Sequence, residues 1–244
     1  MIINNISHSR IELFKQCQYK YRLLYHDKIK SPLPEEQHFV FGKFIHKMLE
    51  LIVKDKLTNE IAINKSLEMF SNLDRSYLEK LPNIIRHFDY FQKQIYNEDF
   101  LKETTEETFE LPVFDGEFVF KGVIDRKIFY KNGKVLIIDY KTSQKKNQIK
   151  KELANQNPQL IIYTWASNLT EKIDIDNIHS MLFYLNSGNT IFANPNKKTI
   201  ELCINDICKT AMEIKNLIPE LAKPNPGPLC NYCEYRTICK YFKF

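Results

Sequence analysis

Two aspartates and a lysine in the middle of the chain have the types and spacing for metal-assisted chemistry. Asp125 lies in the run Gly122-Val-Ile-Asp125-Arg126, and Asp139 and Lys141 lie in Ile137-Ile138-Asp139-Tyr140-Lys141-Thr142. Carboxylates in apolar surroundings are costly unless a cation compensates them. Aspartate oxygens suit a hard divalent ion such as Mg²⁺ or Mn²⁺, which can polarise a phosphoryl oxygen and activate water. The Lys141 ammonium could hold that water or stabilise charge on the phosphate. A plain Asp–Lys pair at the end of a surface strand would explain the same residues.

A second group consists of cysteines near the C-terminus. Cys230-x-x-Cys233-x5-Cys239 places three thiols within ten residues, in a loop opened by Pro226-Gly-Pro228. A single C-x-x-C pair fits either a redox or a zinc site, whereas structural zinc sites usually contain two such pairs. A fourth ligand would have to come from elsewhere, and Cys17 is the best candidate. The remaining cysteines, Cys203 and Cys208, have apolar neighbours and are predicted to be small buried side chains.

The aspartates require two adjacent strands to bring them together. Strands are expected over Glu117–Tyr130 and Val135–Tyr140, joined by an Asn-Gly turn at Tyr130–Gly133. Because side chains alternate along a strand, Asp139 and Lys141 should face one side of the sheet and Tyr140 the other. Three further strands are expected, over Thr105–Val113, Ser180–Leu185 and Thr190–Ala193.

Helical periodicity predicts the other elements. Ser9-x-x-Glu12 is typical of a capping box and predicts a helix running to about Leu24. A Pro-bearing loop follows, and the C-terminal tail is expected to be irregular. The other predicted helices cover about 38–56, 60–72, 75–97 (kinked at Pro82), 158–168 and 199–218. This order predicts an α/β fold with a mixed sheet. The chain has no Gly-x-x-x-x-Gly-Lys-Ser/Thr element, which argues against an ATP-driven motor of its own.

Composition excludes several classes of protein. With 244 residues, 43% of them hydrophobic, the chain can build a core and is neither a disordered tail nor a disulfide miniprotein. The longest apolar run, Met181–Leu185, is too short for a membrane helix, and the N-terminus lacks the features of a secretory signal. A reducing cytoplasm is therefore the expected compartment, where six cysteines indicate metal binding or catalysis before disulfides.

The net charge of +5 is unevenly distributed. Residues 1–30 carry +4, residues 140–151 carry +5 and residues 223–244 carry +3, so the rest of the chain is acidic. Such segregation suits a face that binds a polyanion, although runs of charge are also common on ordinary solvated surfaces.

Four motifs together resemble the PD-(D/E)XK nuclease superfamily, and more narrowly its RecB-like group. The group's motifs read Gly-x-x-x-His, Gly-x-x-Asp-Arg, Asp-Tyr-Lys-Thr and Gln-x-x-x-Tyr. This chain carries all four in order, at Gly42–His46, Gly122–Arg126, Asp139–Thr142 and Gln159–Tyr163. The resemblance implies a restriction-endonuclease-like core over about 38–185, with a mixed central sheet flanked by helices and a helical insertion at about 57–100.

The resemblance also implies roles for individual residues. The metal would be held by His46, Asp125, Asp139 and the Tyr140 carbonyl, with Asp125, Asp139 and Lys141 catalytic. Gln159 and Tyr163 would approach the DNA backbone, and Arg126 would contact phosphate or form a structural salt bridge. Glu110 matches a less specific acidic position. The basic residues that follow the Asp139–Thr142 motif, Lys145 and Lys146 among them, are expected to bind the DNA backbone.

A subset of RecB-like nucleases carries one cysteine before the core and three after it, which bind a [4Fe–4S] cluster. Ser7-x-Ser9-Arg10-Ile11 with Cys17 resembles the first part, and Cys233-Glu-Tyr-Arg236-Thr-Ile-Cys239 resembles the last. Gln18 departs from the proline usual there. The resemblance implies a cluster on Cys17, Cys230, Cys233 and Cys239. Its expected role is architectural, tying residues 1–30 to residues 219–244, and such a protein should be brown.

The expected activity is that of a deoxyribonuclease dependent on Mg²⁺ or Mn²⁺, formed by a single nuclease domain over residues 1–244. An exonuclease that prefers single strands or ends is favoured, acting in recombination, repair or phage DNA processing with a helicase or recombination partner and no membrane. One alternative is a CRISPR-adaptation nuclease, which shares both motif sets. The other is a non-catalytic iron–sulfur DNA-binding subunit of a helicase–nuclease, against which the intact set of His46, Asp125, Asp139 and Lys141 argues.

Overall fold

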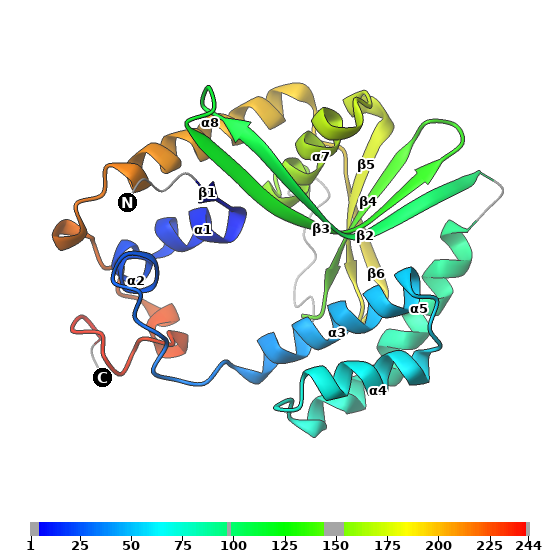
Figure 1. The fold of residues 1–244 in the computed structure, drawn as a ribbon, viewed down its shortest axis with the longest axis horizontal. Coiled ribbons are helices and arrows are strands. Elements are labelled where there is room, and N and C mark those ends of the chain that lie inside the picture. Colours follow the sequence, from blue (N-terminus) through cyan, green and yellow to red (C-terminus); the bar gives the residue numbers. More distant parts are fainter. Residues whose placement is uncertain (1–4, 97–98, 144–153, 243–244) are drawn as a thin grey trace. The chain divides into compact units, whose positions relative to one another are not determined.

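The computed structural model describes residues 5–96, 99–143 and 154–242 (Figure 1). The chain forms two compact units, and neither is continuous in sequence. The central unit comprises Gln37–Phe109 and Val123–Cys203, and the terminal unit comprises Met1–Glu36, Glu110–Gly122 and Ile204–Phe244. The expectation of a single nuclease domain over residues 1–244 stays a prediction.

The described strands form one mixed sheet in the order β1-β3-β4-β5-β6, with β2 paired to β3. Strands β3 and β4 are antiparallel, β4 and β5 are parallel, and β5 and β6 are antiparallel. The mixed α/β fold expected from the sequence is therefore confirmed. The bounds are β1 Asn5–Ile6, β2 Phe100–Val113, β3 Phe118–Tyr130, β4 Val135–Lys141, β5 Ile178–Tyr184 and β6 Asn189–Ala193.

Strand β4 is the centre of the sheet in the central unit. Its apolar, β-branched sequence is buried from Val135 to Tyr140, as expected for a strand covered on both faces. The turn before it uses Gly133 at a φ of 80°, a conformation that glycine adopts without strain. Together β3 and β4 place Asp125 and Asp139 on neighbouring strands.

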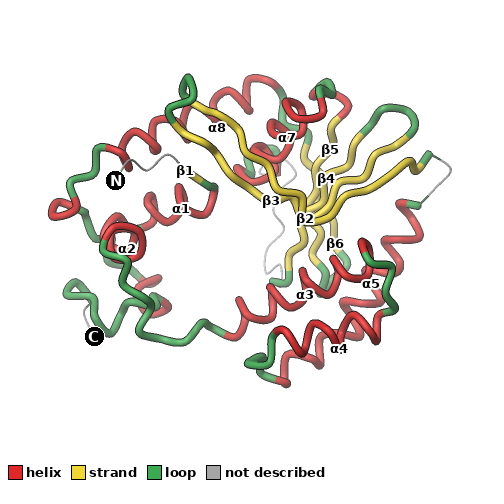
Figure 2. The backbone as a smooth tube through the Cα atoms, in the orientation of Figure 1, coloured by secondary structure: helices red, strands yellow, loops and turns green. Residues whose placement is uncertain are grey.

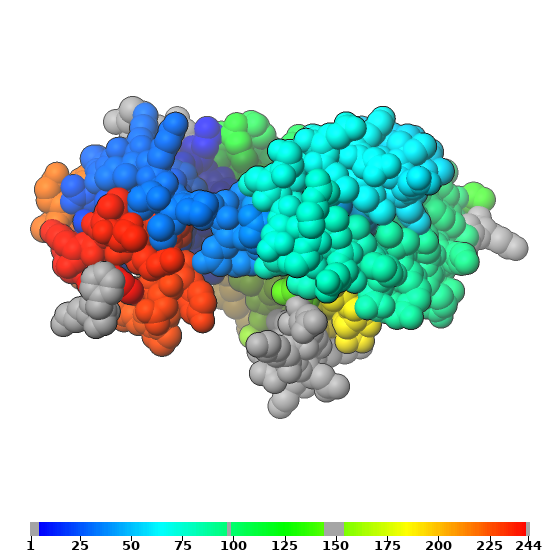
Figure 3. Space-filling view, turned by 90° about the horizontal axis from the view of Figure 1, so that it is seen from below, coloured from blue at the N-terminus to red at the C-terminus, as the bar shows by residue number. Residues whose placement is uncertain are grey.

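Helices cover both faces of this part of the sheet (Figure 2). On one face lie α3 (Gln37–Lys54), α4 (Asn59–Met69) and α5 (Leu81–Ile95), whose apolar side chains share a core with Ile138 and Tyr140 of β4. The blue to blue-green surface of the central unit in Figure 3 belongs to these helices. On the other face α7 (Pro158–Glu171) packs against β4 and β5, where Leu160 and Leu182 belong to a smaller apolar cluster.

The terminal unit contains β1, α1 (His8–Gln16), α2 (Gln18–Tyr21) and the part of α8 (Lys197–Lys215) from Ile204 onward. It also contains a π-helical turn (Arg22–His26), two 3₁₀ turns (Pro219–Leu221 and Pro228–Tyr232) and the parts of β2 and β3 that fall within Glu110–Gly122. None of the helices in the described part of the chain is both long and apolar enough to cross a membrane.

Two helix predictions were wrong in detail. Ser7, not Ser9, caps the first helix, and its side chain accepts a hydrogen bond from the Arg10 N–H. That helix ends at Gln16, because Cys17 adopts an extended backbone with φ −164°. Pro82 does not kink a helix over 75–97. A 3₁₀ turn covers Arg75–Lys80, and Pro82 lies in the first turn of α5, where its missing N–H costs nothing.

Candidate active site

The structure brings three of the proposed metal ligands together in the central unit. His46, on α3, has its Nδ1 3.4 Å from Asp125 Oδ1 on β3. The antiparallel register pairs Arg126 with Ile138, so Asp125 lies opposite Asp139 and both carboxylates share one face of the sheet. The other oxygen of Asp125 accepts a hydrogen bond of 2.7 Å from the backbone N–H of Tyr140.

Lys141 is held between two partners. Its Nζ lies 2.7 Å from Asp139 Oδ2, forming an ion pair, and it donates a 2.9 Å hydrogen bond to Gln159 Oε1 on α7. The Gln159 amide in turn donates to the Tyr163 hydroxyl at 2.7 Å. The Asp-Tyr-Lys-Thr and Gln-x-x-x-Tyr motifs are thus joined in one chain of contacts, with Tyr163 buried at 6% exposure.

The electrostatics of the site favour the binding of a cation. Asp139 is 2% exposed, and burial together with the nearby Asp125 charge raises the pKa of its carboxyl to about 6. Burial alone would lower the pKa of His46, but hydrogen bonds to Asp125 and Glu106 raise it to about 10. Both shifts reflect the negative charge that Asp125 and Glu106 concentrate at the site.

One group of donors has the size of a metal site. Ligand atoms of His46, Glu106 and Asp125 lie within 4.8 Å of one another, the only such group in the described ranges. Two carboxylates and an imidazole fit a divalent ion of the Mg²⁺ or Mn²⁺ type. Asp139 stands opposite Asp125 as a further oxygen donor, and the assignment of the Tyr140 carbonyl stays a prediction.

Glu106 is the residue that the sequence did not indicate. Its Oε1 lies 3.8 Å from His46 Nδ1. Glu110, which matched an acidic position by motif, is exposed in the terminal unit and pairs with Lys121 at 2.6 Å. Glu106 has a φ of 47° within β2, a left-handed conformation that is uncommon for a residue with a side chain.

That irregular residue reverses the faces of β2. Glu103 and Glu107 are four residues apart and would share a face in a regular strand. Instead Glu103 binds Arg126 and Glu107 binds Lys127, which are consecutive on β3 and point to opposite faces. The break at Glu106 therefore acts as a β-bulge, a device known to redirect side chains.

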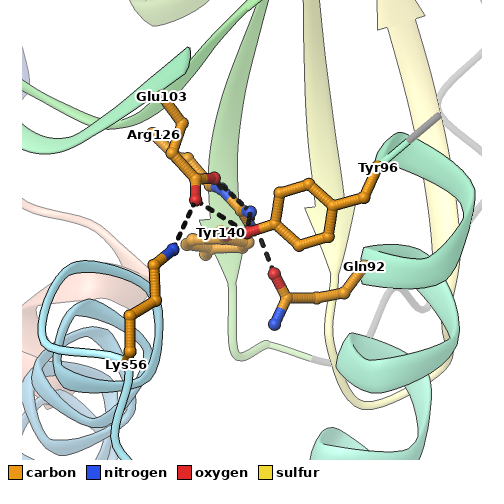
Figure 4. Close-up of polar contacts among 6 residues, drawn as sticks. All are labelled: Lys56, Gln92, Tyr96, Glu103, Arg126 and Tyr140. Carbon is orange, nitrogen blue, oxygen red and sulfur yellow. Dashed lines mark hydrogen bonds and ion pairs between the residues drawn. The ribbon is translucent and has the colours of Figure 1, made fainter. Parts of the chain in front are cut away.

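Arg126 lies in a buried polar network with Glu103, Gln92, Tyr96 and Tyr140 (Figure 4). Its side chain is 0% exposed, and it donates to Glu103 Oε2, Gln92 Oε1 and the hydroxyls of Tyr96 and Tyr140 at 2.5–3.2 Å. Of the two roles considered for Arg126, the structure favours the salt bridge, because a fully buried guanidinium cannot reach a phosphate. Tyr140 is thus held by two hydrogen bonds. Its backbone N–H donates to Asp125, and its hydroxyl accepts from Arg126, whose side chain lies on the other face of the sheet from that of Asp125.

Lys127 forms a second buried clamp. It is 0% exposed and pairs with Glu107 of β2 and, at 2.7 Å, with Glu171 in the last turn of α7. The Lys127–Glu171 pair connects α7, the helix that carries Gln159 and Tyr163, to the sheet. Lys145 and Lys146, proposed to grip DNA, lie outside the described residues.

The four cysteines proposed as cluster ligands all lie in the terminal unit as free thiols. The segments around them are bonded to one another. Tyr19 N–H donates to the Lys223 carbonyl at 3.1 Å, and Asn225 donates to the Gln16 carbonyl at 3.0 Å. Lys20 pairs with Glu234 at 2.7 Å. Among the described residues the sulfurs do not form a group as compact as the His46 site.

A mixed sheet with an aspartate pair and a lysine on adjacent strands, beside a histidine-bearing helix, defines a nuclease of the PD-(D/E)XK class. The sequence model of the PD-(D/E)XK nuclease superfamily matches residues 5–240, and the chain belongs to this family. The family expected from the four motifs is therefore confirmed.

The curated relatives are much longer proteins, each named as a subunit of an ATP-dependent helicase/deoxyribonuclease. The chain is 28% identical over 186 residues to the relative from Streptococcus agalactiae, covering 69% of this chain and 17% of the relative. The protein of the same name from Streptococcus mutans is 27% identical over 228 residues, covering 81% of this chain and 19% of the relative. The chain thus spans less than a fifth of these relatives.

One solved structure, described as "Crystal structure of SSO0001", aligns with 99% of this chain and 88% of its own at 17% identity and a TM-score of 0.48. No functional conclusion rests on this likeness.

Proposed function

We propose that the chain is a DNA nuclease that hydrolyses phosphodiester bonds with Mg²⁺ or Mn²⁺. The observation that carries the proposal is the convergence of separate sequence motifs. His46 from α3, Asp125 from β3 and the Asp139–Lys141 pair from β4 meet at one place, although they lie up to 95 residues apart. Such convergence is hard to explain by a surface Asp–Lys pair, since Asp139 is 2% exposed.

Each residue of the site has a separate task. His46, Glu106 and Asp125, with Asp139 opposite, would hold the ion, which would supply Lewis-acid polarisation of the phosphate and a more acidic bound water. Lys141, oriented by Gln159, donates hydrogen bonds to the attacking water or to the phosphate oxygens on which negative charge builds. The Tyr140 N–H fixes the orientation of the Asp125 carboxylate.

A DNA substrate and a helicase partner are supported by the name of the relatives, which describes an ATP-dependent helicase/deoxyribonuclease. The finer proposal is an exonuclease that prefers single strands or ends and acts in cytoplasmic recombination, repair or phage DNA processing. A partner motor would present the separated strand, since the chain lacks the phosphate-binding loop of such a motor.

A [4Fe–4S] cluster on Cys17, Cys230, Cys233 and Cys239 also stays a proposal. Its support is that the chain segments around Cys17 and those preceding Cys230 are hydrogen-bonded to each other across about 200 residues. Burial raises the pKa of the Cys233 thiol, so a thiolate at this position is unfavourable by itself. Iron would offset that cost, because it binds the thiolate form of cysteine.

The test of the activity is a digestion time course on 5′- and 3′-labelled single- and double-stranded DNA with Mg²⁺ or Mn²⁺. Asp139→Ala and Lys141→Ala should abolish cleavage, while Lys134→Ala, a matched change in an exposed turn, should leave it intact. The order in which the two labels are released gives the polarity. Cleavage that persists unchanged in both active-site variants would refute the proposal, and DNA binding with no metal-dependent cleavage would favour the non-catalytic alternative.

A further inference from the structure

Helix α3 has two distinct faces, and His46, which is half-buried, lies on the face turned away from the apolar core. The core face carries Phe44, Ile45 and Met48, each 0% exposed. Phe39 precedes His46 by seven residues, which is close to two full turns, so both side chains project from the same side of the helix.

Phe39 is an aromatic ring turned toward solvent. It is 58% exposed, whereas Phe41 and Phe44 on the same helix are 2% and 0% exposed. The imidazole of His38 lies against it, with ring centroids 4.0 Å apart and planes inclined by 39°. Single exposed apolar residues are common on protein surfaces. A functional role for Phe39 therefore depends on where it lies relative to the active site.

The end of β4 passes α3 between Phe39 and His46. A Cβ placed on Gly42 would lie 3.6 Å from Thr142 Oγ1, so the residue after Lys141 is next to the helix one turn before His46. This strand end is held in place, because the Thr142 carbonyl accepts a hydrogen bond from the Asn186 amide and the Lys141 carbonyl accepts one from Leu185 N–H at 3.0 Å.

These positions form a row that begins at the metal site. Going along α3 from His46 toward its N-terminus, the row passes Thr142 beside Gly42 and then reaches Phe39. A helix rises 1.5 Å per residue, so Phe39 lies about 10 Å from His46 along the axis. Stacked nucleotides of one strand are separated by about 3.4 Å, so this distance corresponds to about three nucleotides.

We infer that Phe39 stacks on a base of a single-stranded substrate, about three nucleotides from the scissile phosphate. The faces of unpaired bases are available to aromatic side chains, whereas those of a duplex are occupied by neighbouring base pairs. Phe39 is thus a residue that determines strand specificity. The inference rests on the proposed nuclease function and supplies a structural basis for its single-strand preference.

The first experiment measures binding without metal, by fluorescence anisotropy of a labelled single-stranded oligonucleotide in EDTA. Phe39→Ala should weaken binding about 5- to 30-fold, in the range of one lost base–aromatic stack. Phe39→Trp should retain it. Tyr90→Ala removes another exposed helical aromatic, 67% exposed on α5, and should have no effect. Affinity for a blunt duplex should change less than twofold in every variant.

The second experiment follows single-turnover cleavage of oligonucleotides that carry one abasic site at successive positions. The wild type should slow most when the abasic site is about three nucleotides from the cut, and Phe39→Ala should lose that sensitivity. If both proteins give the same profile and the same single-strand affinity, the stacking inference is wrong while the nuclease proposal stands. If the wild type neither binds nor cleaves DNA, both proposals fall.

Discussion

Lys141 owes its position to side chains from another element. Its ammonium contacts Asp139 on its own strand and Gln159 on α7, and Gln159 is fixed in turn by the Tyr163 hydroxyl. A long, flexible lysine held at two points loses little freedom when it binds a reacting group. The catalytic geometry therefore depends on residues that need not touch the substrate themselves.

Gln159→Ala should lower kcat about 10-fold or more with a smaller change in KM, because the Lys141 ammonium is no longer directed at the reacting atoms. Tyr163→Phe removes only the last contact of the chain and should have a milder effect. Steady-state kinetics on a single-stranded substrate measure both. A rise in KM at constant kcat for Gln159→Ala would instead indicate a role in substrate binding alone.

Glu106→Gln should raise the metal concentration needed for half-maximal cleavage about 10-fold, since it removes one anionic donor near His46. Glu110→Gln is the matched control, because that acid pairs with Lys121 at the surface. A Mn²⁺ titration of cleavage rate compares them. Equal metal dependence in the two variants would remove Glu106 from the site.

At the scale of elements, regular periodicity was readable from the sequence and irregular backbone was not. As expected from alternation, Tyr140 points away from Asp139 and Lys141, into the core beneath α3 and α5. The observed bounds of β4 differ from the expected ones by one residue. The bulge at Glu106 follows no local pattern. It allows Glu103 and Glu107 to reach partners on opposite faces of β3, and such tertiary contacts leave no periodic trace in the sequence.

The same limit explains the helix errors. Both Ser7 and Ser9 could cap a helix, and only the fold selects Ser7. Buried and exposed arginines look alike in a motif, so the sequence left two roles open for Arg126. The structure separates them by its exposure of 0% and its neighbours.

Glu103→Gln should destabilise the protein by about 3–5 kcal/mol near neutral pH, because it leaves the Arg126 guanidinium buried without its anion. Burial alone would raise the pKa of Glu103, but the Arg126 charge and hydrogen bonds outweigh it and lower the pKa. A lowered folded-state pKa gives stability that is present above the unfolded value of about 4.3 and lost as pH falls through the folded value.

Urea unfolding of wild type and Glu103→Gln at a series of pH values measures the stability that the Glu103 charge contributes. The difference in unfolding free energy should be constant above about pH 5 and should narrow toward about pH 3. Glu60→Gln, an exposed change in the first turn of α4, serves as the control. A difference independent of pH would mean that the Glu103 charge contributes nothing.

At the scale of the whole molecule, the charge segregation seen in the sequence is partly neutralised within the terminal unit. Lys20 pairs with Glu234, Arg22 with Asp27, and Lys15 with Asp206. These basic residues therefore contribute less to binding a polyanion than their number suggests. The segment 144–153, with most of the remaining lysine run, lies outside the described residues.

Purified protein should contain about four iron atoms per chain and absorb broadly near 400 nm, if the proposed cluster is present. Cys233→Ser should lose both the iron and the colour, whereas Cys203→Ser should retain them. Iron analysis and visible spectra provide the measurement. A colourless wild type prepared without air, containing zinc or no metal, would exclude the cluster.

The discontinuity of the two units has a consequence for biosynthesis. The terminal unit needs Ile204–Phe244 as well as Met1–Glu36, so its first segment emerges from the ribosome long before its last. Ile11 and Phe14, buried in the finished unit, have no complete core to enter while residues 37–203 are being made. The central unit is therefore expected to fold first, and the apolar side chains of α1 stay without their complete core until residues 204–244 have been made.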